Sequence, residues 1–138
     1  IIMEKFSVKK VFEIAYAHRL LDYNGKCENL HGHNGIVEII VETIKLDEMS
    51  MVMDFVELKN KAGSWLNDNL DHTVILSKKD PLAKILKEQN QKMFLTDENP
   101  TAEIIAKTIK DELNKMGIKA KEIRFWETQS SMAKIEEE

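Results

Sequence analysis

Alternating apolar and polar residues predict two long strands in the first third of the chain. The first runs from about residue 10 to 18, and the second from 31 to about 46. Side chains of one parity share one face of a strand. On the first strand this face carries Phe12, Ile14, Tyr16 and His18, and on the second it carries His31, His33, Val37, Ile39 and Val41. The histidines are therefore expected on the side with the larger share of apolar residues.

Apolar residues at helical spacing predict two helices. Asp54 opens the first, with Glu57 three positions on as in a capping box, and the apolar pattern continues to about Asn69. The second helix is capped by Asn99 or Thr101 and ends near residue 117. Its apolar stripe consists of Ala102, Ile105, Ala106, Ile109, Leu113 and Met116.

The remaining segments complete an α+β pattern. Residues 77–98 are expected to hold a short helical turn and a strand around 92–95, and further strands are predicted at 122–128 and 132–135. The main order, strand–strand–helix–helix–strand–strand, predicts a four-stranded antiparallel sheet with two helices on one face. Because the chain has 138 residues and neither a repeat nor a linker, residues 1–138 are expected to form a single domain.

Composition narrows the possible partners. The 20 basic and 24 acidic residues give a formal net charge of −4, whereas a general nucleic-acid-binding protein would normally carry a basic stripe. No apolar run approaches the roughly 20 residues that a membrane span needs. The first ten residues lack the apolar core of a signal peptide, and a single cysteine cannot form an intramolecular disulfide. We therefore expect a cytoplasmic protein without a nucleic-acid or membrane partner.

Three of the four histidines suggest a metal site. On a strand, the spacing of His31 and His33 aims both imidazoles at the same side, whereas a helix would turn them roughly 200° apart. His18 lies at the end of the neighbouring predicted strand and can supply a third nitrogen. Three neutral histidines with an open fourth position are typical of catalytic zinc. The alternatives are an ordinary pair of histidines or another divalent metal.

Cys27 lies in a predicted loop shortly before His31. Two functional interpretations compete for it. It is either a fourth ligand that closes a structural zinc site, or a thiolate base beside a catalytic zinc, whose charge would lower the thiol pKa. A buried cysteine can also act only as a small hydrophobic residue. The spacing of the residues leaves all three open.

Two further groups are candidates for proton transfer and binding. Asp71 directly precedes His72, and a carboxylate beside an imidazole fixes its tautomer and raises its pKa, although such sequence neighbours are often an exposed loop pair. Glu127 shares strand parity with Ile123 and Phe125, so its carboxylate is expected to face an apolar side, where it needs partners. The edge of an aminopyrimidinone would satisfy both oxygens, while a glutamate reaching solvent is the alternative.

Six short segments, spread in order over nearly the whole chain, resemble the signatures of the 6-pyruvoyl-tetrahydropterin synthase family. They are AHRL at 17–20, CENLHGHN at 27–34, MDFVELK at 53–59, LDH at 70–72, NPTAE at 99–103 and WET at 126–128. The resemblance implies the tunnelling fold (T-fold), whose units form trimers around a β-barrel. Two trimers usually stack into a hexamer, with active sites between subunits. A homo-oligomer is therefore expected.

The same resemblance implies roles for individual residues. His18, His31 and His33 correspond to the zinc ligands of the family, and Cys27 to its catalytic thiol. Asp71 and His72 match the acid–base partners of that thiol, and Glu127 matches the carboxylate that anchors the pterin ring. Thr101 and Thr128 fall in segments that line the pterin pocket in relatives, and Arg19 and Lys26 are candidates for contacts with a triphosphate.

The implied substrate is 7,8-dihydroneopterin triphosphate. The chain looks closer to the 6-carboxy branch, which forms 6-carboxy-tetrahydropterin with loss of acetaldehyde and triphosphate and feeds queuosine and other 7-deazaguanine bases. In the 6-pyruvoyl branch the side chain is retained. Glu28 beside Cys27 leaves a third activity open, because some family members use a glutamate here and cleave dihydroneopterin for folate-type pterins. A non-catalytic protein with a closed zinc site is the rival from another class.

Overall fold

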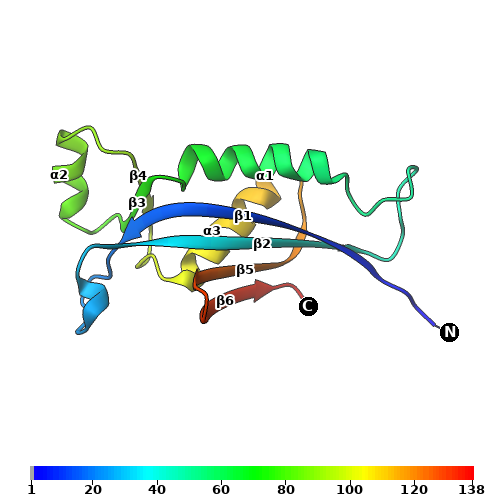
Figure 1. The fold of residues 1–138 in the computed structure, drawn as a ribbon, viewed down its shortest axis with the longest axis horizontal. Coiled ribbons are helices and arrows are strands. Elements are labelled where there is room, and N and C mark those ends of the chain that lie inside the picture. The colour runs from blue at the N-terminus through cyan, green and yellow to red at the C-terminus, as the bar shows by residue number, and fades with distance from the viewer. Residues whose placement is uncertain (1) are drawn as a thin grey trace.

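The computed structural model describes residues 2–138, which form three α-helices, one 3₁₀ turn and six strands. In chain order these are β1 (Phe6–His18), the 3₁₀ turn η1 (Lys26–Glu28), β2 (His31–Thr43), α1 (Phe55–Asn69), β3 (Thr73–Ser77), α2 (Leu82–Glu88), β4 (Met93–Thr96), α3 (Ala102–Lys115), β5 (Ala120–Thr128) and β6 (Ser131–Glu136). Figure 1 shows β1 and β2 crossing most of the length of the molecule, with α2 at one end and the N-terminus at the other. The architecture is α+β, as predicted.

All six strands join one sheet in the order β4-β3-β1-β2-β5-β6. The pairs β1–β2, β2–β5 and β5–β6 are antiparallel, whereas β1–β3 and β3–β4 are parallel. The four predicted antiparallel strands are therefore present, but two parallel strands extend the sheet beyond the predicted count. Alternation does not predict β3, because four of its five residues are buried and no polar face marks the strand.

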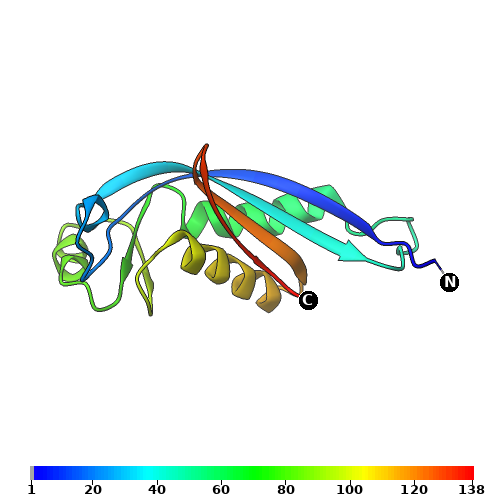
Figure 2. The same ribbon diagram turned by 90° about the horizontal axis from the view of Figure 1, so that it is seen from below.

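Helices α1 and α3 cover one face of the sheet, and Figure 2 shows the other face bare. The side chain of Asp54 caps α1 by accepting a hydrogen bond from the amide of Val56. The hydroxyl of Thr101 caps α3 by accepting from the amide of Ile104. The segment 77–98 adds α2, a short helix with no buried residue. No helix within residues 2–138 is long and apolar enough to cross a membrane.

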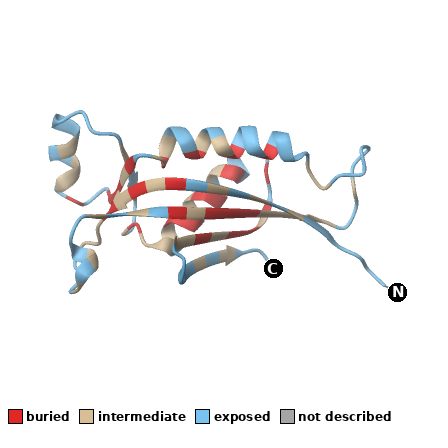
Figure 3. Cartoon of the chain, in the orientation of Figure 1, coloured by how far each residue is buried: buried red, intermediate tan, exposed pale blue. Residues whose placement is uncertain are grey.

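The hydrophobic core fills the space between the sheet and these two helices, as the buried residues in Figure 3 show. Its fully buried members include Ile14, Val37, Ile39, Leu58, Ile75, Ile105, Ile109, Ile123 and Phe125. The bare face instead carries ion pairs, such as Lys9 with Glu38 and Lys134 with Glu122. Because strand parity puts His18 on the same face as Ile14, the sheet turns its imidazole inward, toward the core side.

Candidate active site

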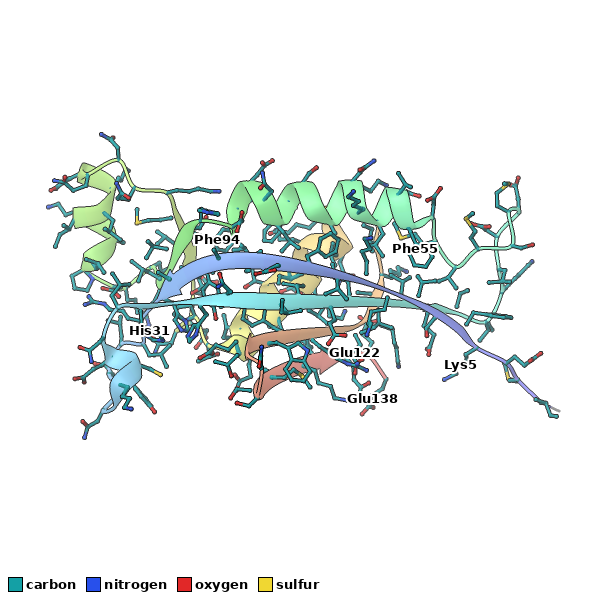
Figure 4. The ribbon with its side chains drawn as sticks, in the orientation of Figure 1. Lys5, His31, Phe55, Phe94, Glu122 and Glu138 are labelled. Atoms are coloured by element: carbon teal, nitrogen blue, oxygen red, sulfur yellow. The ribbon has the colours of Figure 1, made fainter. Side chains whose placement is uncertain are left out.

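The register of the sheet brings three histidines together at one end of the core side. His18 lies directly opposite His31 across the β1–β2 ladder, and His33 follows two residues along β2. The ring centroids of the three imidazoles are 4.6, 5.2 and 4.8 Å apart. One ligand atom from each of these rings and from Glu127 of β5 lies within 4.8 Å of the others. Figure 4 shows His31 at the end of β2 next to η1.

Backbone carbonyls fix two of the three rings. Nδ1 of His18 lies 2.8 Å from the carbonyl oxygen of Pro100, and Nδ1 of His31 lies 2.7 Å from that of Asn29. Because a carbonyl oxygen only accepts, each Nδ1 carries a proton, and Nε2 of the neutral ring carries a lone pair. The two Nε2 atoms face each other at 3.1 Å. Two lone pairs at this distance repel each other, and a cation bound by both nitrogens removes the repulsion.

The third histidine supports the same interpretation. Nε2 of His33 is 3.2 Å from Oε1 of Glu127, which is within ion-pair distance. The two groups are not aligned for a hydrogen bond, so this buried nitrogen has no hydrogen-bond partner. Burial lowers the pKa of His18 and of His33, although Glu127 opposes the shift in both. Both rings are therefore kept in the neutral form that binds a metal.

The donor set fits a zinc ion. Zinc–nitrogen distances and a tetrahedral angle predict about 3.3 Å between two ligating nitrogens, close to the 3.1 Å between the Nε2 atoms of His18 and His31. Glu127 also offers a carboxylate oxygen within 4.8 Å of these nitrogens. Cys27, half-buried in η1, is not among the groups whose ligand atoms gather here. The arrangement therefore does not support the closed site in which Cys27 is the fourth ligand.

Asp71 and His72 form the expected pair away from these histidines. Oδ2 of Asp71 is 3.0 Å from Nδ1 of His72, and Oδ1 accepts a hydrogen bond of 2.8 Å from the amide of Ala15. That amide, more than His72, lowers the pKa of Asp71. The His72 side chain is 81% exposed. Within residues 2–138, no hydrogen bond or ion pair joins Asp71 or His72 to the side chain of Cys27.

The two threonines lie in different places. Thr101 uses its hydroxyl to cap α3, immediately after the carbonyl group that holds His18. Thr128 has the opposite strand parity from Glu127 and lines, with Trp126, a hollow of about 440 Å³ on the bare face of the sheet. The side chains of Thr128 and Glu127 therefore lie on opposite faces of the sheet and do not share one pocket. Another hollow, of about 380 Å³, adjoins Glu127 and is also lined by Ala102, Glu103, Ser131, Met132, Ala133 and Lys134.

Arg19 is engaged inside the protein, which argues against its expected contact with a triphosphate. Its Nε and Nη2 donate to the two carboxylate oxygens of Asp80 at 2.8 and 2.5 Å. The Asp80 side chain has no exposed surface, and the hydrogen bonds from Arg19 are the main cause that lowers its pKa. Lys26, the other candidate for a phosphate contact, is exposed in η1. The pair of Arg19 and Asp80 ties the start of α2 to the chain that follows His18.

Two residues lie at the site although the sequence analysis gives neither of them a role there. Asn99 accepts a 2.9 Å hydrogen bond from the amide of Leu21 and donates one of 2.9 Å to its carbonyl oxygen. It thereby holds the segment after His18, although the sequence suggests it only as a helix cap. Tyr16 is buried beside the histidines, and its hydroxyl has no partner. Its strand parity with His18 is the signal that places it there.

The fold and the site define a class of protein, namely a T-fold domain with a candidate metal centre of three histidines at one end of the sheet. The sequence model of the family described as 6-pyruvoyl tetrahydropterin synthase matches residues 7–138. The chain therefore belongs to the 6-pyruvoyl tetrahydropterin synthase family, whose members are enzymes. This confirms the resemblance seen in the six sequence segments.

Individual relatives agree with this assignment. A Rickettsia bellii protein named 6-carboxy-5,6,7,8-tetrahydropterin synthase is 38% identical over 103 residues, which cover 73% of this chain and 75% of that protein. One of the same name from Aquifex aeolicus is 33% identical and covers 97% of this chain and 99% of its own. Because relatives at this identity, over most of the chain, are named as tetrahydropterin synthases, the chain is an enzyme, and it belongs to the lyases.

Solved structures support the fold. An uncharacterized protein from Wolinella succinogenes superimposes with a TM-score of 0.80 at 23% identity, over 98% of this chain and 99% of that one. The 6-pyruvoyl tetrahydropterin synthase of Caenorhabditis elegans gives a TM-score of 0.72 at 21% identity, over 99% and 98% of the two chains. The predicted T-fold is therefore confirmed.

Proposed function

We propose that this chain is a zinc-dependent lyase that converts 7,8-dihydroneopterin triphosphate to 6-carboxy-tetrahydropterin, with loss of acetaldehyde and triphosphate. This reaction would place it on the route to queuosine and other 7-deazaguanine bases, in the cytoplasm, as the sequence predicts. The names of the relatives at 33–38% identity support the choice of product. The observation that carries the proposal is the facing pair of Nε2 atoms of His18 and His31, with the unpaired Nε2 of His33 beside Glu127.

The three Nε2 atoms of His18, His31 and His33 would hold the zinc ion. When bound, the ion supplies Lewis acidity, which lowers the pKa of substrate hydroxyls and makes the neighbouring carbon-bound hydrogens easier to remove. The protein contributes the orientation of the rings through the carbonyl groups of Pro100 and Asn29. Such partners fix the tautomer and raise the basicity of the ligand.

Proton transfer would be divided between Cys27 and His72. In this mechanism the Cys27 thiolate takes a proton from the substrate side chain, and His72 gives or accepts the second proton. Asp71 holds Nδ1 of His72 at 3.0 Å, and therefore leaves the other ring nitrogen free for exchange with the substrate. The amide of Ala15 fixes the Asp71 carboxylate in turn, so the pair is anchored to β1.

Glu127 would bind the pterin ring. With Nε2 of His33 bound to the metal, the Glu127 carboxylate would keep its oxygens available to accept the N–H groups of the aminopyrimidinone edge. The hollow of about 380 Å³ beside Glu127 offers space for the ring. Its rim includes Ala102 and Glu103, the first residues of α3.

We also propose that the working site needs a second copy of the chain. The imidazole of His72 is 81% exposed, and within residues 2–138 it forms no hydrogen bond with Cys27. A neighbouring subunit in a trimer or hexamer would bring Asp71 and His72 of one chain to Cys27 of another. The expected homo-oligomer therefore explains why an acid–base pair is fixed in place but faces solvent.

A second candidate activity is cleavage of the dihydroneopterin side chain toward folate-type pterins. Glu28 supports it, because its side chain is exposed in η1 next to Cys27. One structure of Plasmodium vivax 6-pyruvoyltetrahydropterin synthase is described as a catalytic residue mutant in which a glutamate is replaced by alanine. Retention of the pyruvoyl side chain is the third outcome that the family allows.

Mass spectrometry of the products separates these activities. Zinc-loaded protein is incubated with 7,8-dihydroneopterin triphosphate, and pterins and small carbonyl compounds are measured. Carboxypterin with acetaldehyde in equal amounts is the expected result. A hydroxymethyl pterin would assign the reaction to Glu28, a pyruvoyl pterin would assign it to the sister branch, and the absence of turnover by the zinc-loaded protein would refute the proposal.

A further inference from the structure

Tyr16 places a phenol hydroxyl beside the candidate metal centre without giving it a partner. Its side chain is 4% exposed, and the hydroxyl oxygen makes no hydrogen bond. Within residues 2–138, only two buried side-chain polar atoms lack a partner, and the other is Nε2 of His33. These two residues lie opposite each other on β1 and β2, with ring centroids 5.5 Å apart. The two unpaired atoms therefore belong to one cluster.

The phenol ring is held firmly by its neighbours. Its centroid is 5.2 Å from that of His18 and 5.5 Å from that of Phe125. Gly35 provides the space for both aromatic rings, because a Cβ atom at this position would lie 3.0 Å from Cε1 of Tyr16 and 2.8 Å from Cζ of Phe125. The hydroxyl therefore stays unpaired because of where packing holds the ring, and not because the side chain is free to move.

An unpaired buried hydroxyl is a cost to the folded protein. A phenylalanine would make the same ring contacts and would leave no polar group without a partner. The hydroxyl of Tyr16 therefore lowers the stability of the free protein, and a partner that arrives with a ligand would recover this loss.

The proton of this hydroxyl has no acceptor within the described residues. Nδ1 of His18 donates to the carbonyl oxygen of Pro100, and Nε2 of His18 faces Nε2 of His31 at the proposed metal position. A ligand that brings an acceptor atom to this place would therefore satisfy the hydroxyl.

We propose that the Tyr16 hydroxyl donates a hydrogen bond to an acceptor on the pterin ring, next to the N–H groups that Glu127 takes. This inference rests on the proposed function. The aminopyrimidinone edge presents two N–H donors flanked by two acceptors, the C4 carbonyl oxygen and N1. The Glu127 carboxylate would accept from the two N–H donors, and the Tyr16 phenol would donate to one of the flanking acceptors. Tyr16 would then help to determine specificity for the ring.

The test is the substitution Tyr16→Phe, with Tyr23→Phe as control, because Tyr23 is the other tyrosine and is exposed. Binding of 7,8-dihydroneopterin is measured by fluorescence on zinc-free and zinc-loaded protein, with thermal unfolding and zinc content measured in parallel. For Tyr16→Phe we expect about tenfold weaker binding, from the loss of one buried hydrogen bond. The Tm should be unchanged or higher and the zinc content unchanged, and Tyr23→Phe should match the parent protein.

A second ligand identifies the acceptor. In a 2,4-diaminopteridine an amino group replaces the C4 carbonyl. If Tyr16→Phe weakens binding of dihydroneopterin but not of the diamino compound, the carbonyl oxygen is the partner; if it weakens both, the partner is a ring nitrogen. Unchanged affinity for both compounds, or a lower Tm that reveals a partner within the protein, would overturn the inference while the proposed function stands. If the parent protein binds and turns over no pterin, both fall.

Discussion

The ion pair of Arg19 and Asp80 offers a test of how the protein holds the end of β1 in place. The Asp80 carboxylate is buried and accepts three hydrogen bonds, two from Arg19 and one of 2.9 Å from the amide of Leu82. Asp80→Asn removes the charge and leaves a guanidinium that is 27% exposed and partly reached by water. Loss of one partner of a buried pair costs 3–5 kcal/mol, and the exposure of Arg19 favours the lower end. We expect a loss of about 3 kcal/mol in the free energy of unfolding.

Urea unfolding at neutral and acidic pH measures this loss. Arg19 holds the pKa of Asp80 below its ordinary value, so the folded protein binds this proton less readily than the unfolded chain. The stabilisation is therefore complete above about pH 4, the ordinary range for an aspartate, and disappears as the pH falls through the lower folded pKa. The difference between the parent protein and Asp80→Asn should be constant from about pH 5 to 8 and should shrink in more acidic solution.

The matched control is Asp97→Asn. Asp97 likewise forms an ion pair, here with Lys78, but its side chain is 84% exposed. This substitution should therefore have no measurable effect on the free energy of unfolding. If the free energy of unfolding of Asp80→Asn lies within about 1 kcal/mol of that of the parent protein, the pair of Arg19 and Asp80 does not anchor this end of the sheet. The same conclusion follows if the difference in free energy does not shrink in acid.

Three further predictions follow from the site. Asn99→Ala removes both hydrogen bonds to Leu21 and should cost about 2 kcal/mol in urea unfolding, with about tenfold weaker zinc binding in a chelator competition; unchanged zinc affinity would show that Asn99 does not position His18. Gly35→Ala forces a Cβ against the fully buried Phe125 and should cost about 2 kcal/mol, and an unchanged Tm would contradict the packing described. Cys27→Ala should keep its zinc, measured by atomic absorption, and lose at least about 100-fold in turnover, whereas loss of zinc would favour the structural interpretation.

Much of the fold can be predicted from the sequence, because most helices and strands bury only one side and therefore show a regular pattern of apolar and polar residues. Alternation marks β1, β2 and β5, and helical spacing marks α1 and α3. β3 lacks this signal, since four of its five residues are buried. Its parallel pairing with β1 and β4 also depends on segments far apart in the chain, which no local pattern encodes.

The candidate site was predictable to the extent that it depends on strand parity. The spacing of His31 and His33, together with His18 on the next strand, is sufficient to predict the cluster. The distance from His33 to Glu127 is not, because it depends on the pairing of β2 with β5. Parity also argues against Thr128 as a neighbour of Glu127, since adjacent residues of a strand face opposite sides. The role of Arg19 depends on Asp80, a partner 61 residues away.

The segment around α2 has a consequence for how such a protein diversifies. Its seven helical residues bury none of their side chains, and α2 lies at the same end of the molecule as His31 (Figures 1 and 4). The core between the sheet and the helices α1 and α3 closes without it, and the entropy of closing a loop rises only slowly with its length. Evolution can therefore lengthen, shorten or rewrite α2 itself at little cost to folding, provided that the buried Asp80 before it is kept. The protein thus has, at the same end of the molecule as its candidate active site, a region in which new substrate preferences can arise while the fold is inherited unchanged.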